Sequence, residues 1–339
     1  SVTSTFATGD TLTATKMTEI RTAVNDNDSK ITTNTAAIAN FFGGDGSGGD
    51  ITIDATNDNW GVLGEIPANL NFVNFTIPSG LTLTVPAGTT IRCTGVFTNE
   101  GTLNVSKGAT QGNQGFASTG VSASSGPMPS SHPGDTMEAS TYGQFDNDAI
   151  AASKTLIGGG GGAGIPAVIS RTSFGQFRFG GGSGSGNSDS AGGGLVKVYC
   201  EGAILNTGTI SATGQSGGST GGGGGGGIVI LASQTSVDNS AGTINVSGGS
   251  GGSASGSYWG SSGGGGGGIV IMMSPTAPVS GTETVTGGTA GTASTTTTQS
   301  RIAGSGGGGS GGAGGAGGSV SSTNTASAGT DGSDGYVIT

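Results

Sequence analysis

The chain contains few of the side chains that build active sites. Among its 339 residues there are two cysteines, Cys93 and Cys200, and one histidine, His132, while charged residues make up 9%. A single histidine excludes histidine-rich metal sites, and the two cysteines lack zinc-site spacing. Only ten residues are Lys or Arg, against twenty Asp or Glu, so clustered positive charge is missing. We therefore expect no nucleic-acid partner and no anionic-lipid partner.

Long apolar runs are also missing. No stretch is long enough to cross a bilayer, and no signal peptide is seen at the start, so membrane insertion is not expected. Release by cell lysis would need no signal.

Motifs of catalysis are equally sparse. A Ser-His-Asp site would depend on His132, which lies in a proline- and serine-rich segment without a nucleophile elbow. The glycine runs contain Gly-x-Gly-x-x-Gly many times, but strand patterns rather than helices follow them, so the context of a phosphate site is absent. Carboxylate pairs such as Asp331 and Asp334 could serve a glycosidase, yet such pairs arise by chance in acidic loops. The sequence predicts no enzyme.

Glycine, by contrast, is abundant, and its distribution marks a repeat. Of the 77 glycines, many fall in runs that close a repeated unit. One unit starts at the β-branched stretch 195–198, passes Gly-Thr at 208–209 and ends in a glycine run at Gly227. The next starts at 228, passes Gly-Thr at 242–243 and ends in glycines 263–268. Each unit predicts a strand, a turn, a second short strand and a glycine-rich return, which is typical of stacked coils.

The glycine runs leave two interpretations open. Free glycine runs are flexible linkers, because glycine loses more backbone entropy on ordering than any other residue. Alternatively, glycine segments form polyproline-II-type helices, which can approach closely and hydrogen-bond laterally. Each long run leads directly into an apolar strand pattern, as at 228–231 and 269–273. We therefore expect ordered polyglycine-II helices.

Residues 17–41 follow a heptad pattern with polar residues in its core. Asn27 and Asn34 share one core position with Ile20 and Phe41, and the other is held by Met17, Val24, Ile31 and Ile38. A core asparagine costs stability and specifies register and oligomeric state. The heptads Ile-Thr-Thr-Asn-Thr at 31–35 and Val-Asn-Asp-Asn-Asp at 24–28 resemble those of trimeric adhesin stalks. That resemblance implies a parallel trimer in which Asn34 and Asn27 hold an axial anion such as chloride. The alternative is an amphipathic helix packed on its own domain.

The segments between these patterns suggest five parts. We expect an N-terminal attachment segment (1–16), a trimeric coiled coil (17–42), a Gly/Asp hinge (43–50), a β-rich shaft domain (51–108) and a glycine-rich repeat domain with outward loops (109–339). In the shaft, Leu81, Leu83 and Val85 alternate with threonines, which resembles the coils of β-solenoids in extracellular and viral fibres. The predicted fold is mainly β: a coiled-coil helix, then solenoid- or sandwich-like strand repeats interleaved with polyglycine-II helices.

The two cysteines occupy equivalent places in the repeat. Cys93 lies eight residues before Gly101, and Cys200 lies eight residues before Gly208. Stacked coils would bring their Cα atoms to about 4.8 Å, which a disulfide permits. Contact between the two side chains is the prediction, and both free thiols and a disulfide remain open.

Aromatic residues in the outward loops are the candidate binding residues. Tyr258 and Trp259 stand among Ser and Gly between two glycine runs, a composition typical of paratopes. His132 and Tyr142 lie in the largest excursion from the repeat, 108–194. We expect these four residues to bind a receptor. For Tyr258 and Trp259 the alternative is that they cap the glycine layer.

The order of attachment segment, short coiled coil, β-rich shaft and glycine-rich tip resembles phage tail fibres and their tip adhesins. The glycine blocks between variable loops look like the polyglycine-sandwich adhesins of T-even-like phages. This chain differs in carrying its own coiled coil and in interleaving strands with every glycine run. The resemblance implies a homotrimer on the virion tail that binds other tail proteins through its N-terminus and a bacterial surface protein or glycan through its tip.

Two other functions remain open. The chain could be a self-assembling extracellular fibre without a specific receptor. It could also bind ice through flat threonine arrays on glycine helices, for which the run Thr295–Thr298 is the candidate.

Overall fold

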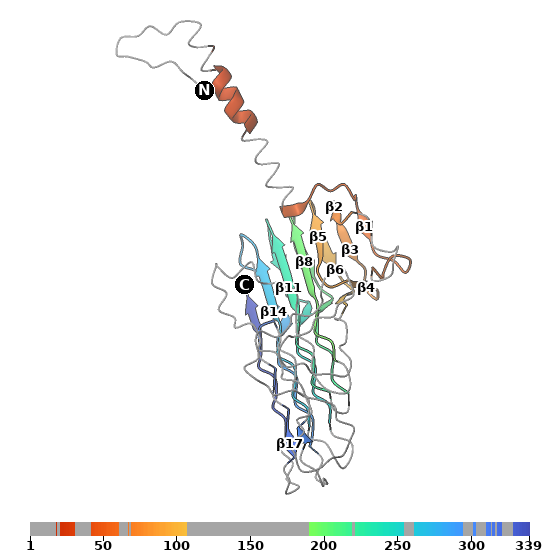
Figure 1. Ribbon diagram of the computed structural model, residues 1–339. Coiled ribbons are helices and arrows are strands. Elements are labelled where there is room, and N and C mark those ends of the chain that lie inside the picture. The colour runs from red at the N-terminus through yellow and green to blue at the C-terminus, as the bar shows by residue number, and fades with distance from the viewer. Residues whose placement is uncertain are drawn as a thin grey trace, which may run out of the picture.

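The structure is a computed structural model of the 339-residue chain (Figure 1). It describes residues 18, 21–30, 42–60, 67, 69–106, 190–218, 221–253, 261–293, 301–302, 310–312, 314–315, 317–320 and 328–339. Within these ranges the chain is mainly β, so the expectation of a mainly β fold is confirmed. Helical geometry occurs there at 18, 21–30 and 42–43.

Most strands belong to three parallel sheets. Sheet A consists, in spatial order, of β1 (Ile51–Thr52), β3 (Phe75–Ile77), β6 (Phe97–Asn99), β9 (Ile204–Asn206) and β12 (Val237–Asp238). Sheet B consists of β15 (Thr282–Thr284), β13 (Thr243–Asn245), β10 (Thr209–Ser211), β7 (Thr102–Val105) and β4 (Thr82–Val85). Sheet C consists of β18 (Tyr336–Ile338), β14 (Ile269–Met273), β11 (Ile228–Ser233), β8 (Leu195–Cys200), β5 (Thr89–Cys93) and β2 (Asn71–Phe72). A separate antiparallel pair joins β16 (Arg301–Ile302) to β17 (Ser319–Val320).

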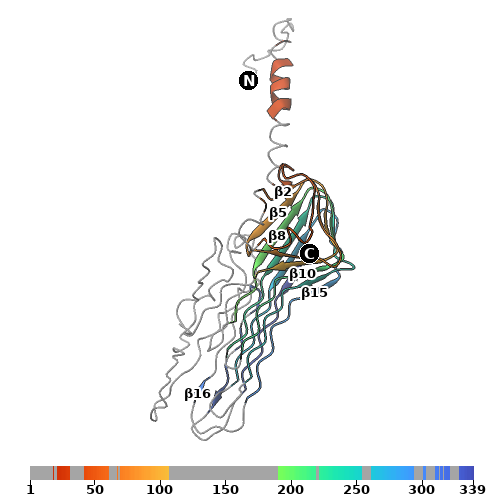
Figure 2. The ribbon, with the colours of Figure 1, turned by 90° about the vertical axis from the view of Figure 1, so that its right-hand side faces the viewer.

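The strands visit these sheets in a fixed rotation. From β2 to β14, consecutive strands lie in sheet C, sheet A and sheet B in turn, so three strands make one circuit. Neighbouring circuits pair in parallel and in register; Ile210, for example, lies between Leu103 and Ile244. Figure 2 shows that the three sheets consequently face one interior.

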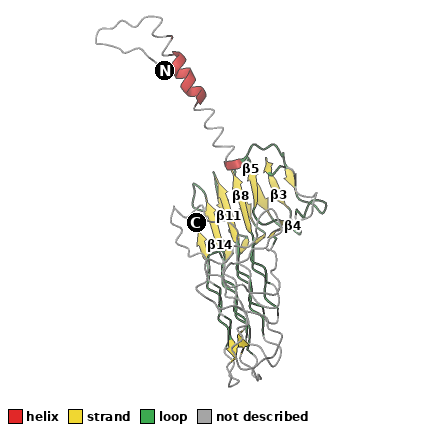
Figure 3. Cartoon of the chain, in the orientation of Figure 1, coloured by secondary structure: helices red, strands yellow, loops and turns green. Residues whose placement is uncertain are grey.

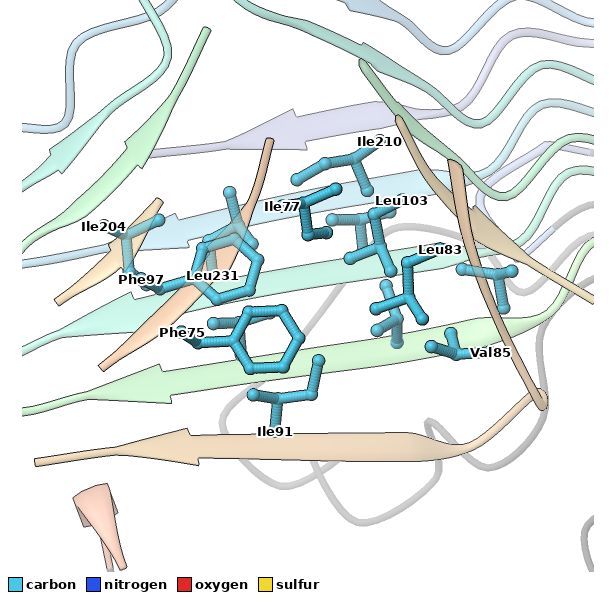
Figure 4. Close-up of a cluster of buried hydrophobic side chains, with 14 of the residues drawn as sticks. Phe75, Ile77, Leu83, Val85, Ile91, Phe97, Leu103, Ile204, Ile210 and Leu231 are labelled. Carbon is cyan, nitrogen blue, oxygen red and sulfur yellow. The ribbon is translucent and has the colours of Figure 1, made fainter. Parts of the chain in front are cut away.

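Inward side chains of all three sheets fill that interior (Figure 4). Period-two alternation positions them, as in Thr89–Cys93, whose first, third and fifth residues are buried. Equivalent residues of successive circuits stack: the rings of Phe75 and Phe97 lie 5.2 Å apart at an angle of 12°. Fully burying a large apolar side chain contributes about 1.5–3 kcal/mol, so these columns carry much of the stability.

Sheet C is buried on both faces in its middle strands. All six residues of β11 are buried, and the outward-facing Leu195, Ile228, Ile230, Ile269 and Ile271 form a second apolar cluster. This explains why its strands are almost continuously apolar, whereas those of sheets A and B alternate with polar residues.

Glycine-rich segments connect sheet B to sheet C, and apart from β16 and β17 their described residues form neither helices nor strands. Figure 3 draws them as loops that continue from one end of the strands. Along each segment, the backbone donors that face one neighbouring segment are three residues apart. The amide of Gly223 donates to the carbonyl of Gly263 (3.0 Å), and that of Gly226 donates to Gly266 (2.7 Å). In the same way Gly264 donates to Thr330 (3.1 Å) and Gly267 donates to Ser333 (2.8 Å). Neighbouring segments on the other side are antiparallel: the amide of Gly249 donates to the carbonyl of Gly224 (2.7 Å), and that of Gly252 donates to Gly221 (2.9 Å).

Close backbone approach explains why these segments are glycine. A Cβ atom on Gly265 would overlap the carbonyl oxygen of Gly224, and one on Gly223 would overlap that of Gly249. Both obstacles are backbone atoms of an adjacent segment, which cannot turn aside as a side chain can.

The predicted hinge, residues 43–50, is attached to the sheets. Gly43 and Gly44 are buried, Gly48 donates to Asn71 (2.7 Å), and Val73 donates to Gly49 (2.7 Å). Gly44 and Gly49 have φ values of 80° and 69°, which only glycine adopts readily. The segment therefore turns tightly against β2.

Each circuit contains one strand that the sequence pattern did not predict. The units were expected to hold two strands, but a short strand of sheet A lies between them, as β9 does between β8 and β10. Sheet pairing also crosses the predicted boundary at residues 108 and 109, because β5, β6 and β7 pair with β8, β9 and β10. The two predicted domains therefore share one core. The last residues form a strand, β18, that pairs with β14.

Candidate functional site

Most of the predicted binding residues lie outside the described residues. These are Tyr258, Trp259, His132, Tyr142 and Asn34, together with the Thr295–Thr298 run. The structure does define where the loop that carries Tyr258 and Trp259 is attached. Residues 246–252 and 262–268 run antiparallel, with Gly268 donating to Val246 (2.8 Å) and Ser262 donating to Gly252 (3.1 Å). Residues 253 and 261, the described neighbours of 254–260, therefore lie at the ends of the glycine segments that are far from the sheets.

Two of the residues predicted for the core of the N-terminal helix lie in its described part, and both are exposed. Val24 is 52% exposed and Asn27 is exposed within the described helical residues 21–30. An apolar side chain at a heptad core position is thus accessible to another chain.

Contacts between aromatic rings join residue 42 to sheet C. The ring of Phe42 lies 5.6 Å from that of Tyr199, and the guanidinium carbon of Arg92 lies 5.6 Å from the centroid of the same ring. Burial raises the pKa of the Tyr199 phenol, while the charge of Arg92 opposes that shift. These contacts hold the end of the helical segment on β5 and β8.

Cys93 and Cys200 occupy directly paired positions of β5 and β8. Both side chains are fully buried and both thiols are free. Burial raises the pKa of the Cys200 thiol, and its hydrogen bond with Cys93 raises it further. The pair therefore belongs to the apolar core.

We predict that neither thiol reacts with iodoacetamide in the folded protein at pH 8. The thiolate is the reactive form; burial disfavours it at Cys200 and blocks access to both sulfur atoms. Mass spectrometry after alkylation should show no adduct in buffer and two in denaturant. Rapid modification of Cys200 in the folded protein would show that this part of the core opens readily.

A ladder of asparagine side chains crosses the interior at the corner between sheets A and B. Asn99 donates to Asn206 (2.7 Å), Asn206 donates to Asn239 (2.5 Å), and Asn239 donates to the carboxylate of Glu283 (2.7 Å). The three asparagines are fully buried, and Oδ1 of Asn99 has no partner among the described residues. Each link fixes the register of two successive circuits, because a shifted circuit would leave buried amides unpaired.

The ladder was missed in the sequence, although a signal exists. Each asparagine closes a short apolar strand and comes two or three residues before a Gly-Thr pair, at 101–102, 208–209 and 242–243. The intervening strands of sheet A have two or three residues, too few for their alternation to stand out.

The outward side of sheet B forms what we term the hydroxyl face. Its first column consists of Thr82, Thr102, Thr209, Thr243 and Thr282, which are adjacent in register. Two residues further along each strand, the second column consists of Thr84, Asn104, Ser211, Asn245 and Thr284. All ten are partly or fully exposed.

The hydroxyl face continues onto the glycine segments that leave sheet B. Exposed or partly exposed Ser and Thr recur there at every third residue: Thr213 and Ser216; Ser247, Ser250 and Ser253; Thr286, Thr289 and Thr292. Neighbouring rows are linked, since the hydroxyls of Thr289 and Ser250 lie 3.1 Å apart. Two different backbone geometries thus present small, uncharged polar side chains, mostly Ser and Thr, on one side of the molecule.

The described residues contain no cluster of three or more His, Cys, Asp or Glu side chains that could hold a metal ion. None of the helices among them is long and apolar enough to span a bilayer.

Comparison with known proteins adds no assignment. The chain matches no protein-family model, no curated protein sequence and no solved structure.

Proposed function

We propose that this protein is a homotrimeric fibre protein that attaches a phage tail to a bacterial surface protein or glycan. The observation that carries the proposal is the set of hydrogen-bonded glycine segments, which extend from a packed β core. Rigid scaffolds that present variable loops are a common design for recognition. The proposed location is the virion tail fibre, with residues 1–16 contacting other tail proteins.

The proposed architecture is a β-solenoid extended by polyglycine-II helices. The rotation of strands through three parallel sheets supports a solenoid. The three-residue spacing of donors along the glycine segments supports a polyproline-II conformation, which has three residues per turn. Because each segment bonds to neighbours on several sides, the bundle would hold its loops in place at little further entropic cost on binding.

The proposed trimer depends on residues 17–42. Exposure of Val24 supports a helix that packs against other copies. In such a coiled coil, Asn27 and Asn34 would hold an axial anion such as chloride.

Substituting Val24 by glutamate is expected to convert the trimer into monomers, because three carboxylates would meet on the axis. Light scattering coupled to size exclusion measures the mass directly. The matched control is Thr22→Glu, since Thr22 lies at the outermost heptad position and is exposed. A wild-type protein that migrates as a monomer would overturn the trimer.

Receptor binding is assigned to the loops, with Tyr258 and Trp259 as anchors and His132 and Tyr142 as further candidates. Aromatic anchors typically cost about 2 kcal/mol or more when truncated. Fluorescently labelled protein should bind intact bacterial cells, and the double variant Tyr258→Ala/Trp259→Ala should bind roughly thirtyfold more weakly. The control Tyr336→Ala removes an exposed aromatic ring from β18 instead. No binding to any cell in a broad bacterial panel would count against an adhesin.

A self-assembling structural fibre is the second candidate, and one end of the sheets favours it. Within the described residues, β15 and β18 pair on one side only, and exposed apolar residues gather there: Met273, Val279, Tyr336 and Val337. The opposite end is closed by Trp60, which is 2% exposed and packs edge-on against Phe75. Unpaired strand edges can join to other chains. Growth of mass with concentration in sedimentation, without cell binding, would favour this function.

A further inference from the structure

The hydroxyl face is rigid and regular in two dimensions. Strands of one sheet lie about 4.8 Å apart, and residues two apart on one strand lie about 6.7 Å apart. Threonine is β-branched, so its hydroxyl and methyl groups take few orientations. Inward neighbours such as Leu103, Ile210 and Ile244 are fully buried, and each strand between β4 and β15 is hydrogen-bonded on both sides. The face therefore presents hydroxyl and methyl groups at fixed repeat distances.

The composition of this face restricts what it can bind. No position in its columns and rows is charged or aromatic. The carboxylates of Asp331 and Asp334 border its last glycine row, where they accept hydrogen bonds from the amides of Ala290 and Gly287. The columns and rows themselves offer no counter-ion to a charged ligand, no aromatic ring for a sugar to stack on and none of the usual anchor residues for a protein partner. What remains is a neutral, flat partner whose hydrogen-bonding groups repeat at similar distances.

We propose that the hydroxyl face binds the surface of ice crystals, an activity beyond the attachment function proposed above. Ice presents neutral donors and acceptors in a rigid lattice, with repeats of the size found on this face. Threonine hydroxyls hydrogen-bond to that lattice, and the neighbouring methyl groups favour binding because their hydration water is released to the bulk. Because the side chains are already ordered, binding costs little conformational entropy. The residues differ from Thr295–Thr298, the run that suggested ice binding in the sequence.

The continuation onto the glycine segments supports the same partner. A local recognition site would end with the sheet. The rows that contain Ser250 and Thr289 instead extend the face along the glycine segments. Binding to a crystal surface is irreversible only when many weak contacts act together, so a larger regular area strengthens it.

The test uses the full-length protein and a single ice crystal observed under a microscope with controlled cooling. Wild-type protein is expected to open a gap between melting and freezing temperatures and to slow recrystallisation. Thr209→Lys, at the centre of the first column, should lose most of both effects, because a long charged side chain holds the face away from the crystal.

The matched control is Thr98→Lys on the outward side of sheet A. Thr98 lies on β6, which is also paired on both sides. Its neighbours across the sheet are Thr76 and Leu205, so this surface lacks the regular hydroxyl groups. This variant should retain the wild-type gap, and circular dichroism should show both variants folded. Absence of a gap and of recrystallisation inhibition in the wild type would overturn the proposal, as would equal activity of the two variants. Cell binding is measured separately, so failure here leaves the attachment function standing.

Discussion

Replacing Gly265 by alanine is expected to lower the free energy of unfolding by about 3 kcal/mol, the upper part of the range for overpacked interiors. The new methyl group would overlap the carbonyl of Gly224, while the amide of Gly265 is held by its bond to Gly249 (2.8 Å). Relief requires two glycine segments to move apart, which breaks hydrogen bonds on both sides. Chemical denaturation followed by circular dichroism measures the loss.

The matched control for Gly265→Ala is Ser216→Ala, in a neighbouring glycine-rich segment. Ser216 is exposed and already carries a Cβ atom, which alanine keeps. The variant therefore loses only the hydroxyl group and the weak hydrogen bond that it accepts from the Ser250 amide (3.3 Å). Such surface changes usually stay within about 0.5 kcal/mol. If Gly265→Ala were as harmless as the control, the glycine segments would not be packed as described.

The second large effect is expected for Asn206→Ala. Asn206 is the middle of the asparagine ladder, where it accepts a bond from Asn99 and donates one to Asn239. Removing it leaves one N–H of the Asn99 amide and Oδ1 of Asn239 without their partner, at about 1–3 kcal/mol for each unsatisfied group, and also creates a cavity. We expect a loss of about 4 kcal/mol in the free energy of unfolding.

Asn104→Ala is the control for the ladder, because Asn104 lies on the outward side of β7 and is partly exposed. Its replacement should change stability by less than about 0.5 kcal/mol. Thermal unfolding of the wild type, Asn206→Ala and Asn104→Ala at one scan rate gives the comparison. A small loss for Asn206→Ala would mean that water or a shifted circuit replaces the amide, so that the ladder does not specify register.

These two variants separate the parts of the molecule that the proposed function needs. The ladder stabilises the stacked circuits, and the glycine segments would carry the proposed binding loops. A Gly265→Ala protein that retains its sheets but loses cell binding would connect the order of the glycine segments to attachment.

The sequence was most informative where apolar and polar residues alternate along a strand that has one buried and one exposed face. Gly-Thr pairs marked the start of β10 and β13, and the spacing of Cys93 and Cys200 along the chain placed them in register. It was least informative in sheet A. There the strands are so short that only the identity of the buried residues, Asn99, Asn206 and Asn239, reveals the repeat. The candidate binding residues stay predictions, because they lie outside the described residues.

By itself, the sequence determined that the chain repeats, that its strands stack with inward apolar residues and that its glycine runs lead into strands. These features are local, since alternation and glycine content follow from neighbours along the chain. Only the tertiary structure decided that three sheets share one interior, that asparagines from distant circuits form one ladder and that Ser and Thr from two backbone geometries lie on one face. The physical reason is that residues such as Asn99 and Asn206, 107 positions apart, acquire their partners only when the circuits stack.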